Sequence, residues 1–544
     1  MRELTTDVLI VGGGLGGVAA AVAVTRLGGR AVLTEESPWL GGQLTSQAVP
    51  PDEHPWVEES GVTARYRELR ERIRDYYRRN YRLRPEVAAE PHLNPGDGWV
   101  SRLCVEPQPA LAAIDEMLAA ARADGRLTVL TGCTPTSVRT EGDRIAAVGF
   151  SIADAELWCS ARYVLDATET GEVVELADVE SVIGSESRDE TGELHARAGA
   201  AEPRDQQALS WCFALEYRPD EPVEPIERPA EYDFWREYRA EFWPGSLLSW
   251  TDVDPRTGIA RTRSLFAESR EQSRDLWRFR RISAAANFAQ PHPGGDISVV
   301  NWPQIDYWLG PIVGVDADER DRHLAGARSL SRSVLHWLQV EAPRPDGGEG
   351  YPGLRPRAGV LGTADGLALR PYIRESRRIR ALTTVVEQHV GIEARRDAGL
   401  PEGSEVFADS VGVGAYRIDL HPSVGGAEGP RGYVDVASYP FQIPLGSLIP
   451  ERVRNLIAAG KCIGTTHVTN GCYRLHPVEW NIGEAAGALA VHCLRTRADP
   501  HAVWEHERSR DDFQRVLAED LGIQLAWPEE IRTSERLNQR GGKH

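Results

Sequence analysis

The sequence is poor in lysine and in net positive charge. Of its 62 basic residues only Lys461 and Lys543 are lysine, and the formal net charge is −19 with a pI near 5.3. Proteins that bind nucleic acid or an anionic membrane surface through charge need clustered basic residues. The charge balance therefore argues against both partners. We interpret the preference for arginine as the codon usage of a GC-rich bacterial genome.

The sequence also lacks a cysteine framework. Its seven cysteines are odd in number, scattered along the 544 residues and never paired as CxxC. Disulfide scaffolds and zinc sites show short, regular spacings between their cysteines or histidines. The pattern indicates reduced thiols in a cytoplasmic protein, and no metal site is expected.

Long hydrophobic runs are missing as well. The apolar stretch near the start is broken by glycines and reaches Arg26, and Arg2 is soon followed by Glu3 and Asp7. A membrane span needs about 20 consecutive apolar residues, and a secretory signal needs a basic start. We expect neither a membrane association nor a targeting segment.

What the start contains instead is a glycine-rich turn. The β-branched run at 7–11 is followed by Gly12, Gly14 and Gly17 and by an Ala- and Val-rich stretch at 18–27. The order predicts a buried strand, a G-x-G-x-x-G turn and a helix. Gly12 allows the tight turn, Gly14 lets the backbone approach a diphosphate, and Gly17 lets helix and strand pack closely.

The strand after this helix ends in an acid. Gly28 and Gly29 stop the helix, residues 30–34 form the strand, and Glu35 follows. A carboxylate at this place accepts hydrogen bonds from a ribose hydroxyl, while free N–H groups at the helix start bind phosphate. The complete order predicts a dinucleotide site. The alternative is a glycine-rich loop without a ligand.

FAD and NAD share this fingerprint, and the next loop separates them. Residues 40–46, LGGQLTS, come almost directly after the acid, where an NAD domain continues into a further strand and helix. A Gly-Gly pair followed by small polar residues resembles the flavoprotein loop that runs along the ribityl chain toward the flavin ring. The expected cofactor is FAD.

Four later segments agree with a flavoprotein. Residues 107–131 predict a helix and then a strand, and 162–170, RYVLDATET, end a strand in Asp-Ala-Thr. Residues 453–464, VRNLIAAGKCIG, end a strand in Ala-Gly, and 469–490 lead into a small-residue helix.

Together with LRPYIRESRRI at 369–379 and FADSVGVGAYRIDLHPS at 407–423, these segments resemble the FAD-dependent oxidoreductase family. This family groups with two-dinucleotide-binding-fold flavoproteins related to the fumarate reductase and succinate dehydrogenase flavoproteins. The resemblance covers most of residues 5–495 and carries no information on the substrate.

The resemblance implies where FAD lies. The ADP half is expected at the glycine turn and its acid, the ribityl chain and ring at the loop over 40–46, and the adenine at the backbone of Cys133. The diphosphate and the pyrimidine edge are expected at Gly460 and at a helix start over 481–486. The expected FAD contacts are Gly12, Gly14, Leu15, Gly16, Gly17, Glu35, Glu36, Gly42, Gln43, Leu44, Thr45, Cys133, Ala167, Thr168, Gly460, Asn481, Ile482 and Glu484.

The flavin is expected to be non-covalent. The quinone-linked relatives attach it through a His just before a Thr of this loop, whereas Leu44 precedes Thr45 here. His54 is the nearest alternative anchor, ten residues further along.

The fold expected is α/β: a glutathione-reductase-type, Rossmann-like FAD-binding domain, discontinuous in sequence, with an inserted α+β substrate domain. Residues 1–180 form its first part and 181–350 the substrate domain. Residues 351–450 are mixed, 451–500 close the FAD domain, and 501–544 form a C-terminal helix and tail.

Five residues are the candidates for catalysis. Arg474 and His476 lie between the last FAD strand and the last FAD helix, where the chain passes the flavin ring. His476 is predicted to take a proton from a substrate hydroxyl or amine, and Arg474 to stabilise the reduced flavin. His54 follows the flavin loop, Arg374 is placed to bind a carboxylate, and His421 is a further acid–base candidate. A structural role is the alternative for each.

The function expected is oxidation or desaturation of a small organic substrate by hydride transfer to FAD, with O2 or another acceptor taking the electrons. A homo-oligomer is compatible with this. Three alternatives stay open: a flavin monooxygenase, a reductase of an activated double bond as in the fumarate branch, and a flavoprotein that only carries electrons. Only one clear dinucleotide fingerprint is present, which disfavours a separate NADPH domain.

Overall fold

A parallel sheet lies at the centre of the computed structural model, which describes residues 2–153, 155–266, 275–292 and 294–538. Its strands are β1 (Arg2–Val11), β2 (Ala31–Glu35), β3 (Leu127–Thr131), β6 (Ala155–Asp166) and β21 (Leu456–Ala458). They run in the order β3-β2-β1-β6, and β21 pairs with β6. Because all five are parallel, their carboxyl ends meet at one edge of the sheet, where such folds bind ligands.

A β-hairpin extends this sheet on one side. β4 (Cys133–Glu141) pairs antiparallel with β5 (Arg144–Ile152), and β5 pairs with the first half of β6. The second half of β6 stays available for β21. One long strand therefore joins the hairpin, β1 and the closing segment of the chain.

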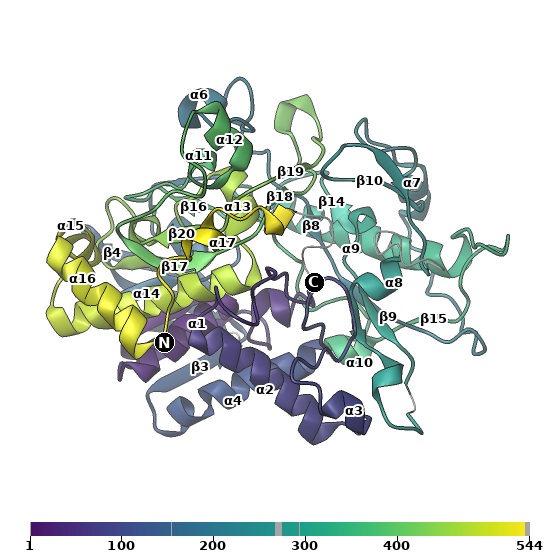
Figure 1. Cartoon of the computed structure of the whole chain (residues 1–544), viewed down its shortest axis with the longest axis horizontal. Coiled ribbons are helices and arrows are strands. Elements are labelled where there is room, and N and C mark those ends of the chain that lie inside the picture. Colours follow the sequence, from purple (N-terminus) through teal and green to yellow (C-terminus); the bar gives the residue numbers. More distant parts are fainter. Residues whose placement is uncertain (1, 154, 267–274, 293, 539–544) are drawn as a thin grey trace.

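Two helices of small residues pack face to face beside the sheet. They are α1 (Leu15–Arg26) and α14 (His476–Thr496), which lie side by side in Figure 1. A Cβ on Gly483 would overlap the carbonyl of Gly16, and one on Gly487 would lie 2.5 Å from the Ala20 carbonyl oxygen. This close contact brings the end of the chain onto the glycine turn at its start.

The remaining elements of the first core surround these helices. The first core is the hydrophobic cluster formed by residues between 8 and 196 and between 379 and 523. Its further elements are α2 (Ala64–Asn80), α4 (Pro107–Ala123), α5 (Glu172–Leu176), α11 (Glu387–Val390), α12 (Ile392–Asp397), β17 (Ser410–Gly414), β18 (Ile418–Leu420), β19 (Val434–Val436), β20 (Phe441–Pro444), α13 (His467–Tyr473), α15 (Pro500–Glu505) and α16 (Glu507–Arg515).

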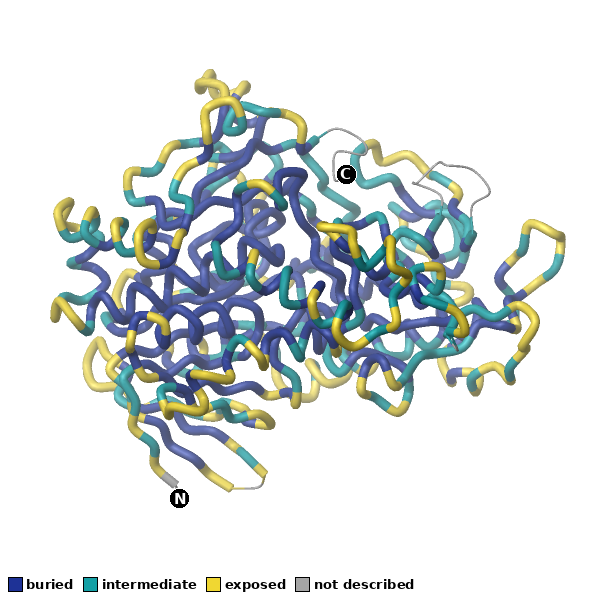
Figure 2. The backbone as a smooth tube through the Cα atoms, turned by 60° about the horizontal axis from the view of Figure 1, so that its bottom comes forward, coloured by how far each residue is buried: buried dark blue, intermediate teal, exposed yellow. Residues whose placement is uncertain are grey.

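A second hydrophobic core packs around an antiparallel sheet. Its strands are β9 (Phe213–Tyr217), β12 (Arg281–Ser283), β13 (Ile297–Val300) and β15 (Leu354–Pro356), in the order β12-β13-β9-β15. The 24-residue helix α9 (Ala317–Val340) belongs to the same core. Figure 1 shows these teal elements beside the first core, and Figure 2 shows the buried chain continuing from one core into the other.

The second core is rich in aromatic side chains and reaches the flavin loop, defined as residues 40–46. It is formed by described residues that lie between 208 and 372, together with Ala48 and Val49. Its buried tryptophans are Trp211, Trp235, Trp243, Trp277, Trp302, Trp308 and Trp337. Since residues 48 and 49 closely follow the flavin loop, the segment after that loop is anchored in the second core.

The structure confirms the local predictions and corrects one boundary. The strand at 7–11, the helix at 18–27, the strand at 30–34 and the helix and strand within 107–131 are present. The last helix starts at His476, with Leu475 as its N-cap, and not at 481. Asn481, Ile482 and Glu484 therefore lie inside α14, because Pro477 fits the first turn of a helix, where its missing N–H costs nothing.

The glycine contact between α1 and α14 makes a stability prediction. Gly483→Ala is expected to lower the free energy of unfolding by about 1–3 kcal/mol, because its methyl group has no room against Gly16. Circular dichroism during heating measures the midpoint. Gly359→Ala is the matched control, since a Cβ there meets nothing within 4 Å. Equal midpoints for Gly483→Ala and the unmodified protein would contradict the prediction.

Candidate functional site

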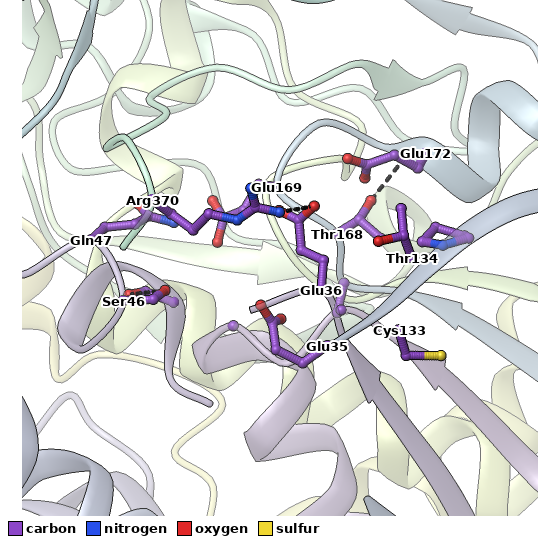
Figure 3. Close-up of a pocket in the computed structure, with 15 residues that line it drawn as sticks. Glu35, Glu36, Ser46, Gln47, Cys133, Thr134, Thr168, Glu169, Glu172 and Arg370 are labelled. Atoms are coloured by element: carbon purple, nitrogen blue, oxygen red, sulfur yellow. Dashed lines mark hydrogen bonds and ion pairs between the residues drawn. The ribbon is translucent and has the colours of Figure 1, made fainter. Parts of the chain in front are cut away.

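A cavity opens at the carboxyl ends of the parallel strands (Figure 3). Strand ends, the glycine turn, the flavin loop and one segment of the second core all contribute to its wall. The residues that line it are Gly12, Gly14, Glu35, Glu36, Gly42, Ser46, Gln47, Cys133, Thr134, Pro135, Ala167, Thr168, Glu169, Glu172 and Arg370.

The three glycines of the turn face different neighbours. Gly12 has a φ of +97°, and a Cβ there would overlap the backbone of Ala167. A Cβ on Gly17 would overlap the carbonyl of Gly12. At Gly14 the nearest atoms would be two glutamate side-chain oxygens at 3.2 Å, with the nearest backbone atom at 3.9 Å. Gly12 and Gly17 thus serve packing, and the backbone of Gly14 faces the cavity.

Glu35 is held at the rim of the cavity by backbone donors. Its Oε2 accepts from the N–H of Gly13 at 2.7 Å, and its Oε1 accepts from the N–H of Ser37 at 2.9 Å. Burial raises the pKa of this carboxyl. Each oxygen has a second lone pair, so the fixed carboxylate can also accept hydroxyl groups of a ribose.

An ion pair connects the cavity to the second core. Arg370 pairs with Glu36, and the two side chains point toward one another in Figure 3. The Arg370 N–H also donates to the Ser46 carbonyl at 3.0 Å. Burial raises the pKa of Glu36 to about 7, against the opposing charge of Arg370. Through these two contacts Arg370 connects the end of the flavin loop, at Ser46, to Glu36 in the cavity wall.

Two carboxylates stand at the point where a diphosphate would approach Gly14. Glu479 Oε1 accepts from the Gly16 N–H at 3.2 Å, and its other oxygen accepts from Gln43. Glu169 pairs with Lys461. Burial raises the pKa of Glu479, Lys461 opposes this, and Glu169 adds to it. The helix N-terminus therefore holds an anion from the chain itself.

The cavity fits FAD. It offers a backbone without side chains at Gly14, the N-terminus of α1, whose N-cap Gly14 makes no side-chain hydrogen bond, and a fixed acid at Glu35. Cys133 borders it from the neighbouring strand, and the loop with Gly42 continues from it toward the second core. Of the expected contacts, Asn481 and Glu484 face elsewhere: Asn481 donates to the Val413 carbonyl and Glu484 accepts from Trp480.

His476 joins the start of α14 to the segment after the flavin loop. Its Nδ1 accepts from the Asp52 N–H at 3.2 Å, and its Nε2 lies 3.2 Å from the Val49 carbonyl oxygen. Burial lowers the pKa of His476 to about 3. Both ring nitrogens are thus occupied by backbone groups on a neutral imidazole. This geometry favours a positioning role over proton transfer.

Arg474 bridges the flavin loop and the second core. Its carbonyl accepts from Gln43 Nε2 at 3.1 Å, and its Nη1 donates to the Tyr372 hydroxyl at 2.8 Å. Its Nη2 donates to the Asp419 carbonyl at 3.1 Å. These contacts place Arg474 beside Gln43, and its role toward the flavin stays a prediction.

Arg374 and His421 meet at one buried carboxylate. Arg374 Nη2 lies 3.0 Å from Asp306 Oδ1, and His421 Nδ1 lies 2.6 Å from Asp306 Oδ2. Ser210 Oγ also donates to Asp306 at 2.6 Å. Burial opposes ionisation, but Arg374 and His421 together lower the pKa of Asp306. Arg374 is therefore engaged in holding Asp306, while His421 gains a fixed orientation.

His54 lies outside this group. Its Nε2 is 3.2 Å from the Gly61 carbonyl oxygen, and its ring packs edge-on against Trp527 at 5.5 Å between centroids. Trp56 and Trp527 belong to a small third hydrophobic cluster. Burial lowers the pKa of His54 to about 4. The sequence places His54 near the flavin loop, but the fold turns its ring toward this cluster.

Sequence reasoning missed six charged residues: five at or beside the cavity, and Arg280, which lies near Asp52. They are Glu169, Glu172, Arg280, Arg370, Lys461 and Glu479. One signal was present: Lys461 is the only lysine before residue 543, and it is buried. The others had none, since their neighbours come from distant parts of the chain.

These features define a Rossmann-like dinucleotide-binding protein. A family model for FAD dependent oxidoreductases matches residues 7–517, so the chain belongs to that family, and it is an FAD-dependent oxidoreductase. FAD is its cofactor. No curated protein matches the chain.

Solved structures match the chain at low identity and with TM-scores well under 0.5. L-proline dehydrogenase from P. horikoshii is 14% identical over 34% of this chain and 24% of that chain, with a TM-score of 0.17. A flavocytochrome c3 fumarate reductase is 16% identical over 31% and 34%, with a TM-score of 0.21. A geranylgeranyl bacteriochlorophyll reductase-like protein from Thermoplasma acidophilum is 11% identical over 95% and 84%, at 0.31. The chain spans about a quarter of the proline dehydrogenase, and none of these likenesses identifies the reaction.

The described residues contain neither a candidate metal cluster nor a candidate membrane span. Within the four ranges that the structure describes, no cluster of three or more His, Cys, Asp or Glu is arranged to hold a metal ion. No helix in those ranges is long and apolar enough to cross a membrane.

The carboxylates at Gly14 predict a pH-dependent affinity for FAD. Glu479 ionises as pH rises through its raised pKa, and its charge then repels the diphosphate. FAD binding to apoprotein is expected to weaken as the pH rises through that raised pKa. Glu479→Gln removes the charge and should bind FAD about tenfold more tightly above it, which corresponds to about 1.4 kcal/mol of binding free energy.

Quenching of FAD fluorescence on titration of apoprotein measures this affinity. Glu505→Gln, at an exposed position of α15, is the control and should keep the pH profile of the unmodified protein. An unchanged profile in Glu479→Gln, or weaker binding at every pH, would disprove the role assigned to Glu479.

Proposed function

We propose that this protein oxidises or desaturates a small organic substrate by hydride transfer to non-covalently bound FAD. The observation that carries the proposal is a chain of hydrogen bonds from the flavin loop into the second core. Gln43 donates to the Arg474 carbonyl, and Arg474 donates to the Tyr372 hydroxyl. These hydrogen bonds support a site beside the expected flavin ring, which we call the polar seam and define as Asp52, Arg280, Tyr372, Tyr416 and Arg474.

The two hydrophobic cores support separate roles in binding FAD and in binding the substrate. We assign the first core to a glutathione-reductase-type FAD domain and the second core, residues 208–372, to an inserted substrate domain. The first core supplies the glycine turn and the second supplies Tyr372 and Asp306. Leu44 has no nucleophilic side chain, which supports a flavin held without a covalent bond.

His421 is the best placed of the three candidate histidines to accept a proton. Asp306 holds its Nδ1, and Nε2 lies 3.8 Å from Asp419 Oδ2, which is beyond hydrogen-bond distance, so that a substrate can approach Nε2. The His421 side chain keeps 21% of its surface exposed, whereas His476 and His54 are enclosed. A base oriented by a carboxylate is the arrangement that proton abstraction needs.

The proposed oxidation balances as follows. FAD, when bound, supplies the acceptor for a hydride and its two electrons. The substrate C–H bond breaks, a proton from the neighbouring O–H, N–H or C–H goes to His421 Nε2, and a C=O, C=N or C=C bond forms. Arg474 positions Tyr372, and His476 holds the segment after the flavin loop in place.

Anaerobic reduction of the FAD-loaded protein tests the proposal. Alcohols, amines, sugars and saturated acids are mixed with it, and loss of the flavin absorbance band is followed in a stopped-flow instrument. At least one class is expected to bleach the flavin. His421→Gln should slow that step about 10²- to 10⁴-fold, which is the range for loss of a general base.

His92→Gln is the matched control, because His92 has a side chain that is 60% exposed. It should leave both the rate and the FAD content unchanged. Bleaching by a chemical donor but by no compound of the panel, or an unchanged rate in His421→Gln, would contradict the proposal. The first result would favour reduction of an activated double bond.

A further inference from the structure

Arg280 is a buried cation whose hydrogen bonds are not satisfied by the protein. It lies between α8 (Leu276–Phe279) and β12 in the second core, and its side chain is 12% exposed. Its Nε and Nη1 atoms are buried and have no hydrogen-bond partner among the residues that the structure describes. Its nearest counter-charge is Asp52, with Oδ2 3.8 Å from Nη2.

The neighbouring arginines of the same segment are satisfied. Arg278 donates to Asp97, and Arg281 donates to Asp97, Asp296 and the Gly96 carbonyl. Arg374, the residue that sequence reasoning assigned to a carboxylate, is paired with Asp306. Arg374 and Arg474 each leave only Nε without an acceptor among the described residues, whereas Arg280 leaves both Nε and Nη1.

A buried guanidinium with two unpartnered nitrogens is costly. A buried donor without an acceptor loses its hydrogen bonds to water without replacement, and the loss is larger for a charged donor. Native proteins rarely leave such groups unpaired unless a ligand or function completes them. The acceptor that best matches a guanidinium is a carboxylate, which takes two parallel N–H groups in one plane.

The seam supplies further donors for the same acceptor. The Tyr372 hydroxyl accepts from Arg474, so its own proton remains to be donated. Tyr372, Tyr416 and Asp52 act electrostatically on both Arg280 and Arg474. Asp52 also donates its N–H to His476. Arg280 thus belongs to the group that borders the expected flavin ring.

We propose that Arg280 binds the carboxylate of the substrate, so that the substrate class is a small organic acid. This rests on the proposed function, since the seam is taken as the substrate site. The carboxylate fixed on Arg280 would set which carbon faces the flavin and which proton faces His421. The specificity follows from charge, because a neutral amide of the same shape leaves the cation unneutralised.

Binding is tested with acids and their amides on the FAD-loaded protein. Acetate, propionate, butyrate and benzoate, each beside its amide, are titrated anaerobically while the flavin absorbance spectrum and the thermal midpoint are recorded. At least one acid should perturb the spectrum and raise the midpoint, and its amide should do neither. Arg280→Met should weaken that acid at least tenfold, and Arg280→Lys should weaken it less.

Arg278→Met is the matched control, two residues away and on the same segment, and should bind the acid as the unmodified protein does. The proposal would be overturned if none of the four acids changed the flavin spectrum or the thermal midpoint. Equal binding of acid and amide, or undiminished binding of the acid to Arg280→Met, would also overturn it. Loss of FAD from Arg280→Met, with acid binding kept in the remaining holoprotein, would assign Arg280 to the flavin instead. An acid that binds through Arg280 without any bleaching in the panel would leave this inference standing and the proposed oxidation refuted.

Discussion

The contact between α1 and α14 is the constraint on which the site depends. Gly483 packs on the Gly16 carbonyl, so two helices from opposite ends of the chain approach at backbone distance. The same contact carries Glu479 to the Gly16 N–H. A bulkier residue at the interface would separate the closing segment from the glycine turn, and the wall of the cofactor cavity would open.

A second consequence of this packing is a polar seam between two apolar cores. Each core buries its own hydrophobic residues. The polar and charged side chains of the seam lie where the two cores meet. Asp306 shows how a buried charge can be stabilised, because its carboxylate is contacted by Arg374, His421 and Ser210. A carboxylate with three donors is stable where an isolated one would be protonated. Arg280 lacks a comparable set of partners, since its Nε and Nη1 have no acceptor among the described residues.

Burial decides the chemistry of the three histidines more than their sequence neighbours do. His54 and His476 are enclosed, and desolvation drives their pKa values down to about 4 and 3. His421 lies at the edge of the seam with one nitrogen held by a carboxylate. The three histidines, which are equivalent candidates in the sequence, therefore differ in their ability to transfer a proton.

The sequence by itself determined the strand, glycine turn, helix, strand and acid at the start, and with them the cofactor, because each depends on neighbours within a few residues. Only the tertiary structure decided that α14 begins at His476 and that the ring of this residue accepts a hydrogen bond from Asp52, 424 positions earlier. It also decided that Arg374 meets Asp306, whereas two nitrogens of Arg280 have no acceptor among the described residues. Such contacts depend on how distant segments of the chain pack together. The spacing of residues in the sequence therefore cannot predict which buried charges are paired.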